Sequence, residues 1–274
     1  MSQTTSYAQA LSVSVAERDR LLAQARELAP QSQSLLDRIG ATAGWRAVDV
    51  GCGPIGILDM LAERVGPTGG VVGLDSVAPF LDIAAEVIKQ RGLSNVSLVR
   101  ADTAATGLAP ASFDLVHERL VLIGPARERI AREMVALARP GGIVATQEVD
   151  VTGSFCEPAH PAWDRLIRAF RESVAAIGAD PSVGRRLGTL LAAAGLERVE
   201  VDVSARLDPP GSARRMQLVD LVSNGRAGIL RAGLLDETAL EGALTELRAH
   251  LEDRATVVFG GLLFQAWGRR PAGT

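Results

Sequence analysis

The stretch Val48–Met60, VDVGCGPIGILDM, joins a short apolar run to a glycine-rich turn and a second apolar run with helical spacing. Gly51, Gly53 and Gly56 stand in the pattern G-x-G-x-x-G. Glycines there let the backbone bend sharply between a strand and a helix, and they let a ligand approach where a Cβ would clash. The pattern is typical of turns that bind an adenosine-bearing cofactor, but it does not distinguish a dinucleotide from other such cofactors.

Two carboxylates and a proline help to distinguish a dinucleotide from other adenosine-bearing cofactors. Asp75 ends the next apolar run, VVGLD, where a carboxylate can accept hydrogen bonds from ribose hydroxyls. Asp49 lies just before the first glycine, where it would repel a pyrophosphate but attract a cofactor with a sulfonium and a free ammonium group. Pro54 removes an N–H that would help to cradle a phosphate, although proline is also simply favoured at a helix start. The stretch therefore favours a sulfonium cofactor.

Strand and helix patterns alternate from Ala47 to Asp150. The apolar runs that we interpret as strands are 47–50, 71–75, 95–102, 112–122 and 143–150, the fourth running on into a helix. The helical patterns between them are 55–65, 77–92 and 126–142. Such alternation predicts an α/β fold with a doubly wound, Rossmann-like parallel sheet, helices on both faces and ligands at the carboxyl ends of the strands.

The segments on either side of this core show other patterns. Apolar residues recur at helical spacing from Val15 to Ile39, and Pro30 predicts a division into two short amphipathic helices. Beyond Asp150 we expect helices at 161–180, 182–197 and within 211–253, and strands at 197–207 and 255–269 that pair antiparallel at one edge of the sheet. We expect one domain over 1–274, with a helical lid at 1–40, a cofactor-binding core at 41–150, and substrate-side helices and closing strands at 151–274.

Composition excludes several classes of function. The 274 residues carry a net charge of −3, and the densest basic run, Arg127–Arg132, is interleaved with an acid, so we expect no nucleic-acid partner. Cys52 and Cys156 have no metal-ligand spacing, and we expect no metal. The first 20 residues lack the pattern of a secretory signal, and no apolar run approaches membrane-spanning length. We therefore expect a cytoplasmic protein without membrane contact.

The ordered motifs VDVGCGPIG, VVGLDS, VRADT, SFDLVHERLVL and LARPGG resemble those of class I S-adenosylmethionine-dependent methyltransferases. The resemblance covers residues 45–150 and is to the small-molecule type related to the ubiquinone-biosynthesis methyltransferases. It implies a seven-stranded sheet whose last strand is antiparallel. It implies S-adenosylmethionine as the cofactor.

The resemblance also implies roles for individual residues. Residues that match the family's cofactor-binding motifs are Asp49, Gly51 and Gly53 at the methionine moiety, Asp75 at the ribose, Ser76 near the adenine, Asp102 and Thr103 at the adenine edge, and Glu118 in the turn beside the methionine end. Two departures stand out. Ile55 occupies a position where many members have a third glycine, and Ile123–Pro125 replaces a histidine-containing signature of the family.

Catalytic candidates lie at the carboxyl ends of the fourth and fifth strands. His117 is a candidate general base, with the alternative that it shapes the cofactor pocket through hydrogen bonds. Arg119, placed at the start of the following helix, is a candidate anchor for a carboxylate or a partner of a structural acid. Glu148 and Asp150 are candidates for binding a cationic substrate or acting as a base, with a structural role as the alternative. The spacing of Glu148 and Asp150 with His160 also suggests a metal site, but the loop between them contains little else that could ligate a metal.

Other single residues have two interpretations each. Tyr7 is either a lid over the cofactor or a packed terminal residue, and His250 is expected at the surface of a mixed-charge helix. Trp163, Phe170 and Met216 either line an apolar substrate pocket or pack in the core.

Three functions remain open from the sequence. The first is methyl transfer to the O, N or C atom of a small molecule by a monomer or homodimer. The second is a relative of the fold that binds S-adenosylmethionine without transferring methyl. The third is a nicotinamide-dependent oxidoreductase, which would bind a pyrophosphate despite Asp49.

Overall fold

The computed structural model describes residues 15–273, which form an eight-stranded sheet in the order β3-β2-β1-β4-β5-β8-β6, with β7 paired to β8. The strands are β1 Arg46–Val50, β2 Gly70–Asp75, β3 Val96–Arg100, β4 Phe113–Arg119, β5 Ala138–Asp150, β6 Phe155–Glu157, β7 Glu197–Asp208 and β8 Val257–Arg269. Strands β1 to β5 are parallel, and β8 is antiparallel to β5 and β7. The predicted doubly wound sheet with an antiparallel last strand is confirmed.

The strand count is eight where the resemblance implied seven. The additional strand, β6, pairs antiparallel with the beginning of β8, and Phe155 packs against Phe259 with ring centroids 5.3 Å apart. A strand of three residues is too short to show alternation in the sequence.

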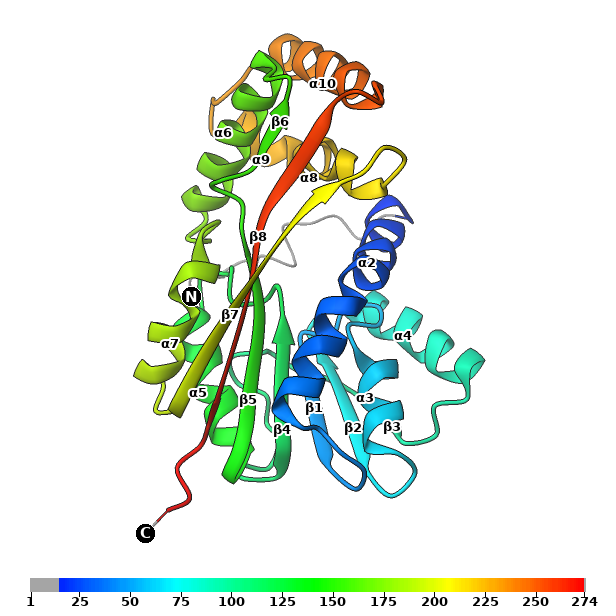
Figure 1. Cartoon of the computed structure of the whole chain (residues 1–274), viewed down its shortest axis with the longest axis vertical. Helices are drawn as coiled ribbons and strands as arrows, with labels where there is room; N and C mark the ends of the chain where they lie inside the picture. Colours follow the sequence, from blue (N-terminus) through cyan, green and yellow to red (C-terminus); the bar gives the residue numbers. More distant parts are fainter. Residues whose placement is uncertain (1–14, 274) are drawn as a thin grey trace.

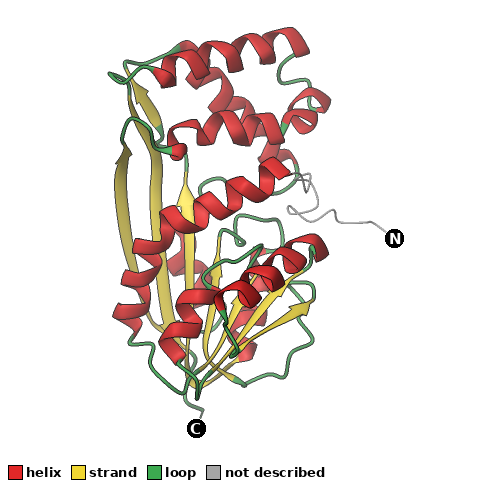
Figure 2. Cartoon of the chain, turned by 90° about the vertical axis from the view of Figure 1, so that its right-hand side faces the viewer, coloured by secondary structure: helices red, strands yellow, loops and turns green. Residues whose placement is uncertain are grey.

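Helices cover both faces of the sheet and form a cap beyond it (Figures 1 and 2). On one face lie α2 Val15–Ile39, α3 Leu58–Val65 and α4 Ala78–Arg91, and on the other lie α5 Arg127–Leu137 and α7 Leu187–Ala193. The cap holds α6 Pro161–Ala176, α8 Gln217–Asn224, α9 Arg226–Arg231 and α10 Glu237–Glu252. Short 3₁₀ turns at Val183–Arg186 and Ala213–Met216 precede α7 and α8. The long strands β7 and β8 extend from the sheet into the cap (Figure 1).

Helix α2 is one continuous helix of 25 residues, so the predicted division at Pro30 is wrong. Proline removes one helical hydrogen bond and crowds the preceding turn, which costs about 3 kcal/mol. Leu28, Leu35 and Leu36 are buried on the same helix. Because burial of each leucine contributes about 1.5–3 kcal/mol, packing offsets the cost of the proline.

Three predicted boundaries are also wrong. Helix α3 begins at Leu58, after Ile55, so Pro54 lies in the turn and not at the helix start. Arg119 ends β4, and the next helix begins only at Arg127. Strand β5 begins at Ala138, because the helix before it ends at Leu137 and not at the Pro-Gly-Gly turn.

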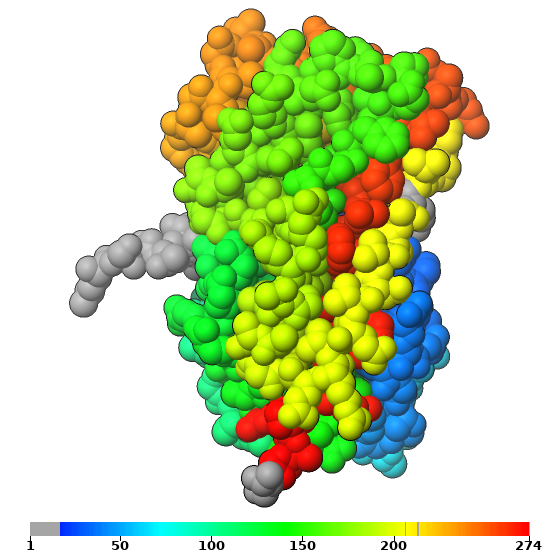
Figure 3. Space-filling model, turned by 60° about the vertical axis from the view of Figure 1, so that its left-hand side comes forward, coloured from blue at the N-terminus to red at the C-terminus, as the bar shows by residue number. Residues whose placement is uncertain are grey.

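Strand β7 was predicted from its alternating valines and forms where expected. Figure 3 shows this strand at the surface, beside β8. Val201 and Val203 are exposed there, at 49% and 45% of their area. Alternation thus identified the strand correctly although the face that carries these valines is exposed.

Candidate functional site

The carboxyl ends of β1, β2 and β4 open into a cavity of about 300 Å³, which we call the sheet cavity. Its lining includes Gly51, Gly53, Asp75, Ser76, Asp102, Thr103 and Arg119, together with residues of α2. A volume of this order is typical of pockets for small ligands. Asp49 also lines it, so most of the residues predicted to bind the cofactor come together here.

A second cavity, of about 440 Å³, lies between α2, α8 and β8, and we call it the cap cavity. The residues that line both cavities, which we call the junction, are Arg20, Gln24, Leu120, Val149, Val151 and Gln217. A ligand in the sheet cavity would therefore face a second ligand in the cap cavity across these six side chains.

The glycine turn is formed by left-handed backbone. Gly51, Gly53 and Gly56 have φ angles of 75°, 55° and 52°, a region that favours glycine. A Cβ on Gly56 would lie 2.1 Å from Oδ2 of Asp49, whereas a Cβ on Gly53 would meet nothing within 4 Å. Gly56 therefore permits close packing against Asp49, and Gly53 leaves open space beside the turn.

Asp75 links the end of β2 to this turn. Its Oδ2 accepts a hydrogen bond from the backbone N–H of Gly53 at 2.9 Å, and its Oδ1 accepts one from Val77 N–H at 2.9 Å. Burial raises the pKa of Asp75, while these backbone hydrogen bonds act in the opposite direction. The carboxylate keeps further lone pairs for a hydroxyl-bearing ligand in the sheet cavity.

A buried network on the α2 face of the sheet starts at Asp49. Asp49 Oδ2 accepts from Ile57 N–H at 3.1 Å, and Asp49 Oδ1 lies 2.7 Å from Nδ1 of His117. Nε2 of His117 lies 3.1 Å from Oε1 of Gln147. The Oγ of Ser32, on α2, donates to the same Gln147 oxygen at 2.7 Å.

Arg119 closes this network into a ring. One end of its guanidinium donates to Ser32 Oγ and the other to the backbone carbonyl of Gly56, both at 3.0 Å. Helix α2 is thereby tied to the glycine turn through two side chains. His117 is fully buried with both ring nitrogens occupied, a geometry that favours the pocket-shaping alternative over proton transfer to a substrate.

A second polar pair lies on the opposite face, where the fully buried side chains of Glu118 and Glu148 interact with each other. Glu118 Oε2 accepts from Val121 N–H and Glu148 Oε1 from Ile123 N–H, both at 3.0 Å. Burial raises the pKa of Glu118 to about 8 and that of Glu148 well above its usual value, and the proximity of Glu118 raises the latter further. Their burial together disfavours ionisation of both carboxyls, and their hydrogen bonds from the backbone of Val121 and Ile123 hold the β4–α5 loop.

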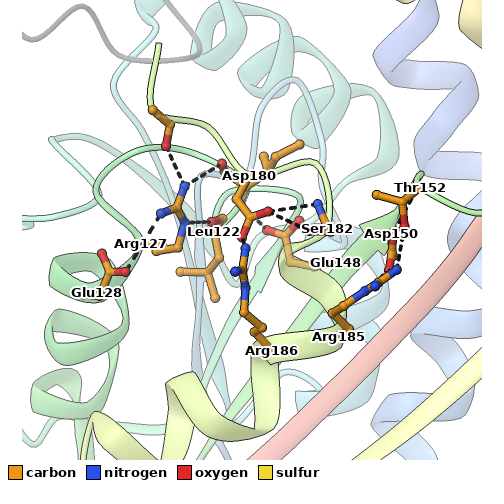
Figure 4. Close-up of polar contacts among 12 residues, drawn as sticks. Leu122, Arg127, Glu128, Glu148, Asp150, Thr152, Asp180, Ser182, Arg185 and Arg186 are labelled. Carbon is orange, nitrogen blue, oxygen red and sulfur yellow. Dashed lines mark hydrogen bonds and ion pairs between the residues drawn. The ribbon is translucent and has the colours of Figure 1, made fainter. Parts of the chain in front are cut away.

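The β4–α5 loop is also held by contacts with Arg127 and with the segment that follows α6 (Figure 4). Arg127 donates to the carbonyl oxygens of Leu122 at 3.3 Å and Gly178 at 2.6 Å, and the backbone N–H of Asp180 donates to Ile123. Loop residue Val121 packs on the turn so closely that a Cβ on Gly51 would lie 2.5 Å from it. The wall of the sheet cavity is therefore fixed by contacts from two directions.

The other predicted residues lie as follows. Among described residues, the lining of the sheet cavity does not include His117, Glu118 or Glu148. Phe170 lines that cavity, whereas Trp163 is buried in the core.

Asp150 is bound by Arg185 and Thr152 (Figure 4). His160 stacks on His250 with ring centroids 4.6 Å apart, so His250 is only partly exposed. Met216 packs beside the core, and Tyr7 lies outside the described residues. Residues 15–273 contain no cluster of three or more potential metal-ligating side chains, and no helix among them is long and apolar enough to cross a membrane.

Sequence reasoning missed Ser32, Gln147 and the junction. Ser32 gave one signal, a polar residue on the apolar face of a helix beside Leu28, Leu35 and Leu36. Gln147 gave none that separates it from an ordinary strand residue. The junction depends on how α2 and α8 pack over β5, which no local pattern specifies.

Comparison with known families matches residues 41–194 to a family described as a methyltransferase domain. The chain belongs to the methyltransferase-domain family. The matched residues include the glycine turn, Asp75 and the β4–α5 loop, so the resemblance stated from the motifs is confirmed.

Relatives of the methyltransferase domain include small-molecule enzymes. Nocamycin O-methyltransferase of Saccharothrix syringae is 33% identical over 135 residues, which cover 49% of this chain and 46% of that protein. Trans-aconitate 2-methyltransferase of Methylobacterium radiotolerans is 32% identical over 190 residues, covering 68% of this chain and 67% of the relative. The chain spans about half the length of most of the first curated relatives it matches.

The methyltransferase domain has the same fold as solved proteins of low sequence identity. The crystal structure of the [4+2]-cyclase SpnF superposes with a TM-score of 0.55 at 21% identity, covering 90% of this chain and 83% of that one. Identity this low establishes a common architecture only.

Proposed function

We propose that the protein transfers the methyl group of S-adenosylmethionine to a small-molecule acceptor. The observation that carries the proposal is the pair of adjoining cavities, one lined by the glycine turn and Asp75 and the other by the cap, with a shared junction. The relatives named nocamycin O-methyltransferase and trans-aconitate 2-methyltransferase support a small-molecule acceptor.

The side chains of the sheet cavity fit this cofactor. Asp75 offers a buried carboxylate to the ribose hydroxyls, with Ser76 beside it, and Asp102 and Thr103 follow β3 on the adenine side. Gly51 and Gly53 line the cavity, and the open space beside Gly53 leaves room for the methionine moiety, whose ammonium group is complementary to the carboxylate of Asp49. When bound, the cofactor supplies an electrophilic methyl group on a positively charged sulfur.

The side chains around the sheet cavity contribute to methyl transfer chiefly by orienting the cofactor and the β4–α5 loop. The ring from Asp49 through His117 to Arg119 fixes the turn against α2, and the pair of Glu118 and Glu148 fixes the β4–α5 loop. Holding two reactants at near-attack distance supplies much of the rate enhancement in a transfer of this kind. We assign His117, Arg119, Glu118 and Glu148 to positioning the cofactor and the loop.

Calorimetric titration tests the cofactor. S-adenosylmethionine and S-adenosylhomocysteine should bind, and NAD should not. Binding of NAD without a response to the other two would support the oxidoreductase instead. Incubation with methyl-labelled cofactor and a metabolite extract tests transfer, and binding without any labelled product would favour a fold relative that does not transfer methyl.

We further propose that the protein acts in the cytoplasm as a monomer or homodimer without nucleic acid. The net charge of −3 and the interleaving of basic with acidic side chains support this proposal. Size-exclusion chromatography with light scattering, and a filter-binding assay with RNA and DNA, test it.

A further inference from the structure

Among the residues that the structure describes, those that line the junction between the two cavities include no side chain that accepts a proton. Of its six residues, Leu120, Val149 and Val151 are apolar, Gln24 and Gln217 are neutral amides, and Arg20 is a cation. Hydroxyl, amine and carbon acceptors lose a proton when they are methylated, so catalysis on them gains from a base within hydrogen-bond reach. An acceptor that binds already ionised needs none.

Glu17 lines the sheet cavity and Asp220 lines the cap cavity, and both acids interact with other side chains. Glu17 is fully buried and accepts from Arg20 at 2.8 and 2.6 Å and from Asn224 Nδ2 at 2.7 Å. Asp220 interacts with Arg20 and Arg248. These carboxylates offset the arginines of the cap cavity and lie outside the junction.

Two further acids line the cap cavity. Glu27 lies 4.0 Å from Arg214, and Asp19 is exposed and contacts Arg18 at 2.7 Å. Neither belongs to the junction. On the other side, His117 has both ring nitrogens occupied within the network of Asp49 and Gln147.

We infer that the acceptor is a carboxylate and that the product is its methyl ester, an inference that rests on the proposed function. One carboxylate oxygen forms the new bond to the methyl carbon with its own electron pair, while the carbon–sulfur bond breaks and its pair stays on sulfur. The anion and the sulfonium become a neutral ester and a neutral thioether, and no proton moves. The amides of Gln24 and Gln217, on α2 and α8, are donors placed to orient the second carboxylate oxygen.

Product chemistry tests the acceptor class. The full chain is incubated with methyl-labelled S-adenosylmethionine and a panel of aliphatic and aromatic carboxylic acids, each matched with the alcohol, amine and amide of the same carbon skeleton, and with a metabolite extract. We expect label only on acids, and we expect mild alkali to release it as volatile methanol. Label that survives alkali, on oxygen, nitrogen or carbon, overturns the acceptor class alone. No label from any source, with cofactor binding intact, overturns the proposed function and the inference with it.

A pH profile and a pair of variants give independent readouts. For a labelled acid, kcat/KM should stay within about twofold from pH 6 to 7.5, whereas an acceptor that must lose a proton gives a rise approaching tenfold per unit. The double variant Q24L/Q217L should lower kcat/KM for the acid by about tenfold or more, the order expected for lost hydrogen bonds to a charged group.

The same variant should abolish the rise in Tm that the acid causes with S-adenosylhomocysteine present. Gln33→Leu is the control, because Gln33 is exposed on the same helix and lines neither cavity. Unchanged acid binding in Q24L/Q217L would remove both amides from the site.

Discussion

Asp49 and His117 lie directly opposite each other on the parallel strands β1 and β4, and Nδ1 of His117 is 2.7 Å from Oδ1 of Asp49. Neither side chain is exposed beyond 2%. The imidazole therefore serves as a buried partner that keeps the carboxylate in place at the base of the glycine turn.

Replacement of His117 tests this role. His117→Ala leaves a buried carboxylate oxygen without its partner, so we expect the free energy of unfolding to fall by about 1–3 kcal/mol. His117→Gln, which retains a donor, should recover part of the loss. Urea unfolding and calorimetry with S-adenosylmethionine measure both effects. If His117→Ala kept normal stability and cofactor affinity but lost methyl transfer, the histidine would be the general base after all.

Asp75 provides a test of the cofactor site itself. Asp75→Ala removes the acceptor of two backbone hydrogen bonds and the proposed partner of the ribose, so cofactor binding should weaken by about 1–3 kcal/mol. Asp75→Asn should bind better than Asp75→Ala because its amide oxygen still accepts. Calorimetry on both variants is decisive, and unchanged affinity in Asp75→Ala would place the ribose elsewhere.

Gly56→Ala should lower the stability of the protein by more than the cost of its left-handed backbone angle alone. A left-handed alanine costs about 1–2 kcal/mol, and here its Cβ would also meet Asp49 Oδ2 and the carbonyl of Cys52. Gly40→Ala is the matched control, with a φ of 68° and nothing within 4 Å of the added Cβ. We expect thermal unfolding to show a clearly larger loss of stability for Gly56→Ala. Equal losses in the two variants would mean that the turn adjusts without strain.

Features of the fold and the site that depend on residues close in sequence could be predicted, whereas features that depend on tertiary packing could not. The glycine turn and Asp75 were found because their conformation and position follow from residues close in sequence, and the structure places them around one cavity. The course of α2 through Pro30 was not found, because burial of distant apolar contacts outweighs the local signal of a proline.

The polar networks mark the limit of sequence reasoning in this protein. His117 and Glu118 are adjacent in sequence, yet alternation along β4 sends one toward α2 and the other to the opposite face. Their partners Gln147 and Glu148 are likewise adjacent on β5. The sequence singled out His117, Glu118 and Glu148 but not Gln147, and only the strand register shows which two residues form each pair.

The Glu118–Glu148 pair predicts an unusual dependence of stability on pH. The pKa of Glu118 is raised from 4.5 to about 8 in the folded protein, so the folded state binds more protons than the unfolded state between these values. This contribution to stability is complete below the unfolded pKa and is lost as the pH rises through the folded one. Glu118→Gln stays neutral and keeps a donor toward Glu148, so its urea midpoint should fall less between pH 6 and 9 than that of the wild type. The urea midpoint of Glu63→Gln, at an exposed glutamate, should fall as much as that of the wild type, and a parallel decline in all three proteins would show that the pKa of Glu118 is not raised in the folded state.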